Sequence, residues 1–261
     1  MRNFNTYNRN KIKRNKRKFA TPLFFITLGF IVSLLLSGAT FKVLLDEING
    51  YNESSGEYEH LREENVQQDD PDAPKEVSNI NHSSLYNINE DYLGWISVED
   101  PDSLINYPLL VCGDADTYLH KSFEKKPNRL GSIFGLPPSN YEKGNVSPKK
   151  YFSSPIVMLF GHNAKNFTMF GTLHKIYDKS ALPRVRIDTL NSAVLKYKTV
   201  FLKKVDTNHQ VYKIKTQEDV NNFLKNSNVN FEGNPKLLVL STCDNSLDES
   251  RRLILCATLE K

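Results

Sequence analysis

The amino-acid sequence predicts a mainly β fold, in which an eight-stranded barrel with a few helices follows an N-terminal transmembrane helix. Two observations predict it. One uncharged apolar run near the N-terminus is long enough to cross a membrane. After residue 85 the apolar runs are short and are bounded by turn residues, as strands are. Eight such runs with irregular spacers predict a closed or nearly closed, antiparallel-rich barrel.

The charged residues are unevenly distributed. The chain has 34 Lys and Arg residues against 30 Asp and Glu, a formal net charge of +4. All eight charged residues before position 42 are basic, so residues 42–261 have a net charge of −4. The positive charge therefore belongs to a short tail, residues 1–18. This distribution argues against a basic nucleic-acid-binding protein.

Residues 19–41 form the predicted transmembrane anchor. These 23 residues carry no charge, and a helix of that length reaches across the ~30 Å hydrocarbon core. The basic residues before the run place the N-terminus in the cytoplasm by the positive-inside rule. A cleaved secretory signal is the alternative, since Ser37-Gly38-Ala39 could serve as a cleavage site, but the length of the run favours an uncleaved anchor. In both cases residues 46–261 are exported.

Residues 42–84 are predicted to be an acidic extracellular stalk. Residues 46–80 are polar and nearly free of large aliphatic side chains, so we expect no core from them, and at most a helix near Gly56–Gln68. The folded domain then spans residues 85–261, a suitable size for a single core.

The predicted strands follow one another along this domain. They are Leu93–Val98, Tyr107–Cys112, Gly131–Phe134, Ile156–Phe160, Arg184–Thr189, Val194–Val205, Lys236–Thr242 and Leu253–Leu259. Two helices are predicted at Thr168–Tyr177 and Thr216–Lys225, the second capped by Thr216 with Asp219 in its first turn. Leu136–Pro155 contains four prolines and is predicted to be a surface loop.

Three cysteines, Cys112, Cys243 and Cys256, are too few and too far apart for a disulfide-stapled scaffold. At least one thiol of this exported chain is therefore free. Cys112 and Cys256 lie inside predicted strands and are expected to be buried free thiols, with a disulfide between them left open.

Cys243 ends one predicted strand, and Arg252 begins the next after a polar loop of eight residues. A hairpin would bring the thiol near the guanidinium, which favours thiolate and can bind an oxyanion. His162 directly follows the predicted strand that ends at Gly161. Cysteine, histidine and arginine together suffice for acyl transfer through a thioester. Spacing alone does not bring His162 to Cys243, and a cysteine at a strand end more often serves packing.

Several motifs resemble those of the sortases, and most of all the class B sortases. They are GWI (Gly94–Ile96), INYPLL (Ile105–Leu110), YLHKSF (Tyr118–Phe123), GSIF (Gly131–Phe134), GHNAKNFTMFGTL (Gly161–Leu173) and LSTC (Leu240–Cys243) with a following arginine. They occur in the family's order and span nearly all of residues 85–261. The predicted helix at Thr216–Lys225 also resembles an insertion typical of class B.

The resemblance implies a sortase barrel and assigns roles to three residues. Cys243 would be the nucleophile, His162 the proton donor to the leaving amine, and Arg252, preferred to its neighbour Arg251, the oxyanion stabiliser. It also implies that Ser241, Leu119 and Asp244 lie near the peptide groove. Three positions depart from the family pattern, namely Ala115, Cys112 and Gly135. No cofactor is implied, and the sequence contains no convincing calcium or zinc ligand set.

The expected function is that of a cysteine transpeptidase of thiol-protease type, anchored by a single span in the membrane of a Gram-positive bacterium. It would cleave a C-terminal sorting signal of secreted proteins after Thr and join the acyl group to an amine of peptidoglycan or its precursor. The alternatives are a sortase of another class, a mainly hydrolytic enzyme, or a non-catalytic exported binding barrel.

Overall fold

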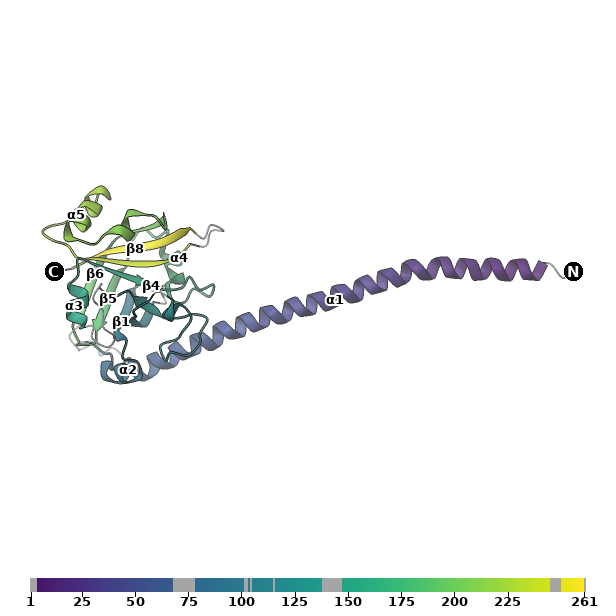
Figure 1. Ribbon diagram of the computed structural model, residues 1–261, viewed down its shortest axis with the longest axis horizontal. Helices are drawn as coiled ribbons and strands as arrows, with labels where there is room; N and C mark the ends of the chain where they lie inside the picture. Colours follow the sequence, from purple (N-terminus) through teal and green to yellow (C-terminus); the bar gives the residue numbers. More distant parts are fainter. Residues whose placement is uncertain are drawn as a thin grey trace. The chain divides into compact units, whose positions relative to one another are not determined.

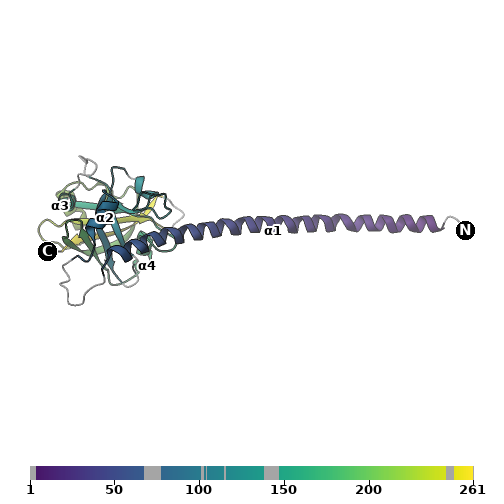
Figure 2. The same ribbon diagram turned by 90° about the horizontal axis from the view of Figure 1, so that it is seen from below.

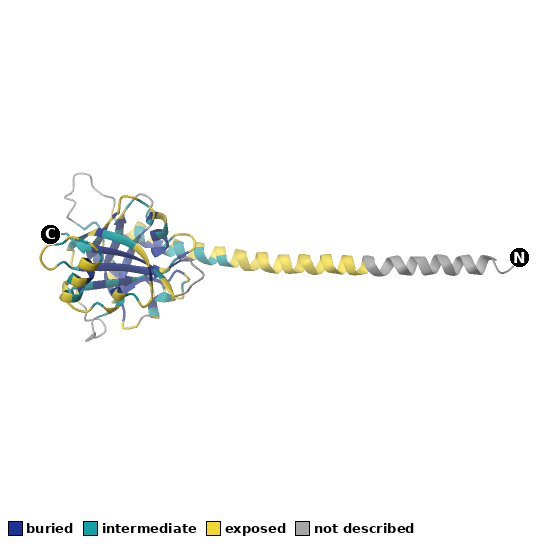
Figure 3. Ribbon diagram, turned by 90° about the horizontal axis from the view of Figure 1, so that it is seen from above, coloured by how far each residue is buried: buried dark blue, intermediate teal, exposed yellow. Residues whose placement is uncertain are grey.

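The computed structural model describes residues 4–67, 78–100, 103, 105–114, 116–137, 147–244 and 250–260, with the backbone alone for residues 4–23. The chain divides into two compact units, Met1–Gly50 and Tyr51–Lys261. Helix α1 (Phe4–Asn65) makes up the described part of the first unit and ends in the second. From Phe24 onward it contains a window that is long and apolar enough to cross a membrane, and none of that window is buried (Figure 3).

The second unit contains a closed barrel of eight strands, which confirms the predicted fold class. The strands are β1 (Tyr92–Glu99), β2 (Asn106–Val111), β3 (Ile133–Gly135), β4 (Ile156–Phe160), β5 (Arg184–Thr189), β6 (Val194–Asp206), β7 (Leu237–Cys243) and β8 (Arg251–Leu259). Their order around the barrel is β1-β2-β3-β4-β7-β8-β6-β5. The pairs β2–β3 and β4–β7 are parallel and the other pairs are antiparallel.

Short helices lie outside the strands of this unit (Figures 1 and 2). They are α2 (His82–Ile88), η1 (Thr117–Leu119), α3 (Pro148–Ser153), η2 (Phe170–Thr172), α4 (Leu173–Ile176), η3 (Gln210–Lys213) and α5 (Gln217–Asn226). Helix α5 has the predicted cap, since the Thr216 side chain accepts from the Asp219 N–H and the Asp219 carboxylate accepts from the Thr216 N–H.

Buried side chains form two hydrophobic clusters, one on each face of β7 and β8. Leu238 and Leu240 point into the barrel with Leu253 and Leu255, whereas Val239 on the other face packs in the second cluster. The second cluster is covered by the segment between β6 and β7, which supplies residues of η3 and α5. We call residues 207–236 the β6–β7 insertion.

The last turns of α1 belong to the core, contrary to the sequence prediction that residues 46–80 supply none. Tyr58 and Leu61 are 1% and 3% exposed and pack in the barrel cluster. The compact unit accordingly begins at Tyr51 and not near residue 85. The stalk prediction failed because these two large side chains are separated by polar residues that face the other side of the helix.

Smaller differences concern the loops. The helix predicted at Thr168–Tyr177 is reduced to the 3-10 turn η2 and the four-residue α4, because Met169 has a positive φ of 50° that no helix contains. Within the predicted loop Leu136–Pro155, residues 148–153 form α3, and residues 138–146 lie outside the described part of the chain.

Candidate active site

Strand pairing brings the three predicted catalytic residues to one end of the sheet. Cys243 and Arg252 are direct partners in the antiparallel pair β7–β8. In the parallel pair β4–β7, Phe160 at the end of β4 is the partner of Ser241, and His162 follows two residues after Phe160, as Cys243 does after Ser241. The two backbone segments remain adjacent beyond the end of β4, since the Thr242 hydroxyl donates to the Gly161 carbonyl at 2.8 Å. Cys243 and Arg252 are thus paired at the ends of β7 and β8, and His162 lies on the loop that follows the neighbouring strand β4.

Alternation along the strands also distinguishes the two arginines. Ile254 and Cys256 face the second cluster, so Arg252 faces the same side of the sheet and Arg251 the opposite side. Cys243 faces the same side as Arg252. Val239 lies four residues before Cys243 on β7, and therefore on the same face of the strand, and it packs in the second cluster. Cys243 itself is exposed at the strand end, and Arg252 is half-buried.

The imidazole of His162 is held by the backbone. Its Nε2 lies 2.6 Å from the carbonyl oxygen of Leu119, which can only accept, so Nε2 carries a hydrogen. The main-chain carbonyl of His162 accepts from the Phe170 N–H at 3.1 Å, which fixes the loop. The ring of His120 lies close by, with a centroid separation of 6.2 Å. A carbonyl thus orients His162, where sequence analysis could assign no carboxylate.

Ser241 is buried, and its hydroxyl lies 2.8 Å from the hydroxyl of Tyr212 in η3. Burial raises the pKa of Tyr212, whereas the Ser241 hydrogen bond and the nearby Arg252 charge act in the opposite direction. Tyr212 is therefore a neighbour of the Cys243–Arg252 row that the sequence did not indicate. Its position depends on how the β6–β7 insertion folds back over β7, which no local motif encodes.

Asp244 follows Cys243 in the sequence, and His174 contacts the Cys243 main chain. The Asp244 carboxylate, with a side chain only 1% exposed, forms an ion pair with Lys204 at 3.2 Å. His174 in α4 is half-buried and its Nε2 lies 3.4 Å from the Cys243 carbonyl. Burial lowers the pKa of His174, so this ring is neutral at pH 7 and donates to that carbonyl. Sequence analysis missed this contact, because α4 reaches the strand end only through tertiary packing.

The other two cysteines are buried free thiols, as predicted, and no disulfide joins them. Burial raises the pKa of Cys112 to about 11 and raises that of Cys256 further. Both thiols are therefore protonated at neutral pH. Among the described residues no group of three or more His, Cys, Asp and Glu side chains could hold a metal ion.

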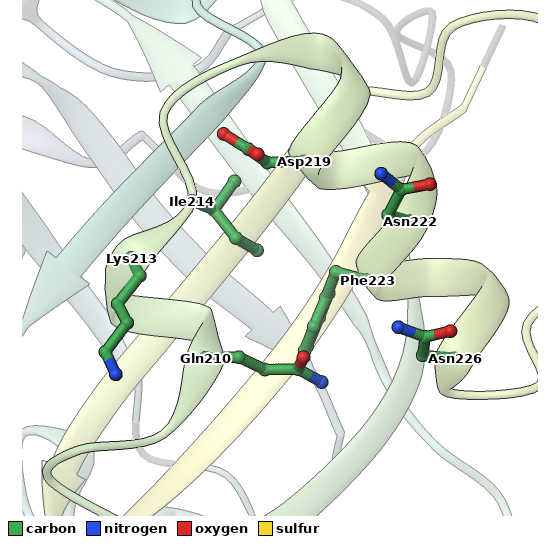
Figure 4. Close-up of a pocket in the computed structure, with 7 residues that line it drawn as sticks. All are labelled: Gln210, Lys213, Ile214, Asp219, Asn222, Phe223 and Asn226. Atoms are coloured by element: carbon green, nitrogen blue, oxygen red, sulfur yellow. The ribbon is translucent and has the colours of Figure 1, made fainter.

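A pocket of about 190 Å³ lies between η3 and α5 of the β6–β7 insertion (Figure 4). Gln210, Asn222 and Asn226 bring amide groups to it, and Phe223 forms part of its wall. None of the predicted site residues lines this pocket.

Solved structures with the same barrel are sortases. A mutant form of Clostridium perfringens sortase B is 25% identical, with a TM-score of 0.55, and the match covers 69% of this chain and 86% of that one. The sortase B of B. anthracis in complex with AAEK1 is 22% identical, with a TM-score of 0.59, over 82% and 99% of the two chains. The fold is thus the sortase fold.

Two curated relatives extend the similarity to the sequence. Sortase B of Listeria monocytogenes is 29% identical over 184 residues, which are 66% of this chain and 70% of the relative. Sortase B of Staphylococcus aureus is 27% identical over 191 residues, 68% and 74% of the two chains. No model of a known protein family matches the chain. The barrel and the sequence similarity together support a class B sortase.

Proposed function

We propose that this sortase is a membrane-anchored cysteine transpeptidase that acts outside the cell. It cleaves a C-terminal sorting signal of secreted proteins after a Thr and transfers the acyl group to an amine of peptidoglycan or its precursor. The observation that carries this proposal is the pairing of exposed Cys243 with Arg252 at the ends of β7 and β8, with His162 on the loop after the neighbouring strand β4. It supplies a nucleophile, a proton carrier and a fixed cation in one place.

In the first half-reaction the Cys243 thiolate attacks the Thr carbonyl carbon. The negative charge that develops on the carbonyl oxygen is stabilised by the Arg252 guanidinium, which shares the face of Cys243. Protonated His162 gives its proton to the leaving amine, the C–N bond breaks, and a thioester remains.

In the second half-reaction an amine attacks the thioester carbonyl and the Cys243 thiolate leaves. The proton lost by the attacking amine returns to His162, which restores the starting state. The Leu119 carbonyl keeps the imidazole in one orientation through both transfers, because Nε2 stays bonded to it.

The peptide is proposed to lie along the face of β7 that carries Ser241 and Cys243. Ser241 and Leu119 would contact it near the thiol, and Tyr212 supports Ser241 through its hydroxyl. The Asp244 carboxylate is paired with Lys204, so any contact from Asp244 to the peptide would come from its main chain.

The placement of the enzyme is also a proposal. The apolar window of α1 after Phe24 would anchor the chain, and the eight basic residues before position 42 would keep the N-terminus in the cytoplasm. Residues 51–261 would then act on the outer side of the membrane.

The test is to incubate the full chain, purified in detergent, with candidate sorting peptides and an amine, and to determine the product masses. Transfer gives the peptide joined to the amine, whereas hydrolysis gives the free acid, which separates the transpeptidase from a mainly hydrolytic enzyme. The proposal requires that Cys243→Ala forms neither product. Wild-type turnover in that variant would contradict it.

A further inference from the structure

The end of helix α1 presents one face to the segments that hold His162. Ser55, Tyr58 and Arg62 lie three and four residues apart and so share a face. That face contacts the barrel, with Tyr58 only 1% exposed. On the opposite side His60 and Glu64 are 68% and 55% exposed in their side chains. The helix therefore has a packed face and a solvent face over the same turns.

The first connection runs from Tyr58 to the Leu119 carbonyl. The Tyr58 hydroxyl donates to the Gly131 carbonyl at 2.5 Å and lies 2.9 Å from the Ser132 hydroxyl. Ser132 in turn bonds on both sides of Leu119, through its N–H to Tyr118 O at 2.8 Å and its hydroxyl to Lys121 O at 2.9 Å. Leu119 O is the acceptor for His162 Nε2.

Gly131 packs closely against the backbone of Tyr118 and Leu119. A Cβ at Gly131 would lie 2.5 Å from Tyr118 O and 2.6 Å from Leu119 O, and its φ of +57° favours glycine. Glu57 adds a second bond, since its carboxylate accepts from the Asn128 side chain at 3.1 Å, and the Asn128 N–H donates to His120 O.

The second connection reaches the loop that carries His162. The Asn166 side chain donates to the Ser55 hydroxyl at 3.1 Å. The Met169 N–H donates to the Tyr107 hydroxyl at 3.3 Å, and the Arg62 guanidinium lies over the Tyr107 ring at 5.5 Å. The helix thus contacts the loop that carries His162 directly, and it contacts the segment containing Leu119 indirectly, through Gly131 and Ser132.

We propose that residues 51–65 of α1 belong to the active-site scaffold and position the His162 imidazole, with Tyr58 as the main positioning residue. This inference rests on the proposed function, in which His162 moves the proton. Tyr58 touches no reacting atom. It acts by fixing Gly131 and Ser132 against the stretch of backbone that contains Leu119.

The test is Tyr58→Phe in the full chain in detergent. The phenyl ring keeps its edge-to-face contact with Tyr107, at 5.4 Å between centroids, and only the hydroxyl is lost. We expect kcat for transfer to fall about ten- to hundredfold with KM for the sorting peptide unchanged, because misplacing a catalytic group by about 1 Å can cost about a hundredfold.

Tyr151→Phe is the matched control. Tyr151 is also buried and its hydroxyl also donates to a backbone carbonyl, that of Leu136 at 3.2 Å. It should lose a similar amount of thermal stability and retain wild-type kcat. His60→Ala, on the exposed face of α1, should change neither. Equal kcat in Tyr58→Phe and Tyr151→Phe would overturn the proposal.

A second readout is independent of turnover. In histidine-selectively ¹⁵N-labelled protein, the hydrogen-bonded Nε2–H signal of His162 should be lost or shifted in Tyr58→Phe and retained in Tyr151→Phe. An unchanged His162 signal refutes the positioning role, whatever the assay shows. A changed signal in a protein whose Cys243→Ala variant still turns over would refute the proposed function alone. If Tyr58→Phe fails to fold, the double variant Ser55→Ala/Glu57→Gln replaces it under the same criteria.

Discussion

Cys243 and Cys256 face the same side of the barrel sheet but lie in different surroundings. Cys256 is the partner of Val239 in the β7–β8 pair, and the β6–β7 insertion covers both. Cys243 lies four residues further along β7, beyond this cover, with Arg252 as its partner. One thiol is completely buried and the other is exposed beside a cation.

The difference shows what makes a cysteine reactive in this fold. Burial stabilises the neutral thiol, which is why the pKa of Cys256 is raised although the charge of Lys203 acts in the opposite direction. At the end of β7 the apolar residues of the second cluster no longer cover the sheet, and the strand partner of Cys243 is arginine, whereas that of Cys256 is valine. Both cysteines lie on the same face of the sheet, and the difference in their expected reactivity comes from the β6–β7 insertion, which buries Cys256 and leaves Cys243 exposed.

The largest effect is expected when Cys243 and Cys256 are replaced by alanine in two separate variants. Cys243→Ala should lower transfer by about a thousandfold or more, because in the proposed mechanism the thioester forms on this thiol. Cys256→Ala, matched in chemistry, should retain turnover and lose only some stability from the small cavity. Rates of product formation by mass spectrometry measure both. A larger loss in Cys256→Ala than in Cys243→Ala would invert the assignment.

The two arginines at the start of β8 provide the next test. Arg252→Ala should lower kcat by about a hundred- to a thousandfold, the cost of losing an oxyanion donor. Arg251→Ala, one residue away on the opposite face, should have at most a small effect. Steady-state kinetics of both variants distinguishes the two arginines. Comparable losses of kcat would show that side chains do not alternate between the two faces at this end of β8.

Thiol labelling tests the cover itself. Between pH 7 and 8 a thiol-reactive probe should modify Cys243 alone, because the raised pKa values keep Cys112 and Cys256 protonated. As the pH approaches about 11, Cys112 should begin to react. Phe223→Ala removes a buried side chain of α5 from the cover. Peptide mapping should then find Cys256 labelled at a rate that stays below that of Cys243.

Control experiments for this test follow from the same residues. Leu182→Ala, at an exposed leucine, should leave Cys256 unlabelled. If Cys256 reacts as fast as Cys243 in the wild-type protein, the β6–β7 insertion does not protect it and the comparison fails.

The strands were largely predictable from local pattern. Ile156–Phe160 and Arg184–Thr189 match β4 and β5 at both ends, because short apolar or alternating runs between turn residues have few other conformations available. The capping residues Thr216 and Asp219 determined the start of α5 in the same way. The barrel itself followed from the number and length of the strands.

What local pattern does not encode is pairing between distant segments. The register of β4 with β7 joins residues about eighty positions apart and brings the strand before His162 alongside the strand that ends at Cys243, so only the family resemblance linked the two residues at the sequence level. The contacts of Tyr58, Tyr212 and His174 are of the same kind. Each depends on a polar or isolated side chain whose partner lies in another element.

The smallest effect is expected at His174, the second histidine that touches the Cys243 region. Its ring donates to the Cys243 carbonyl and is neutral, because burial lowers its pKa. His174→Gln keeps a donor at that position and should change kcat by about twofold or less, whereas His162→Ala should lower it by about a hundredfold or more. Measuring kcat for both variants from pH 6 to 8 distinguishes them. Since burial favours the neutral ring, His174→Gln should leave the shape of the pH profile unchanged between pH 7 and 8. A changed profile would show that His174, and not only His162, takes part in the proton transfer at Cys243.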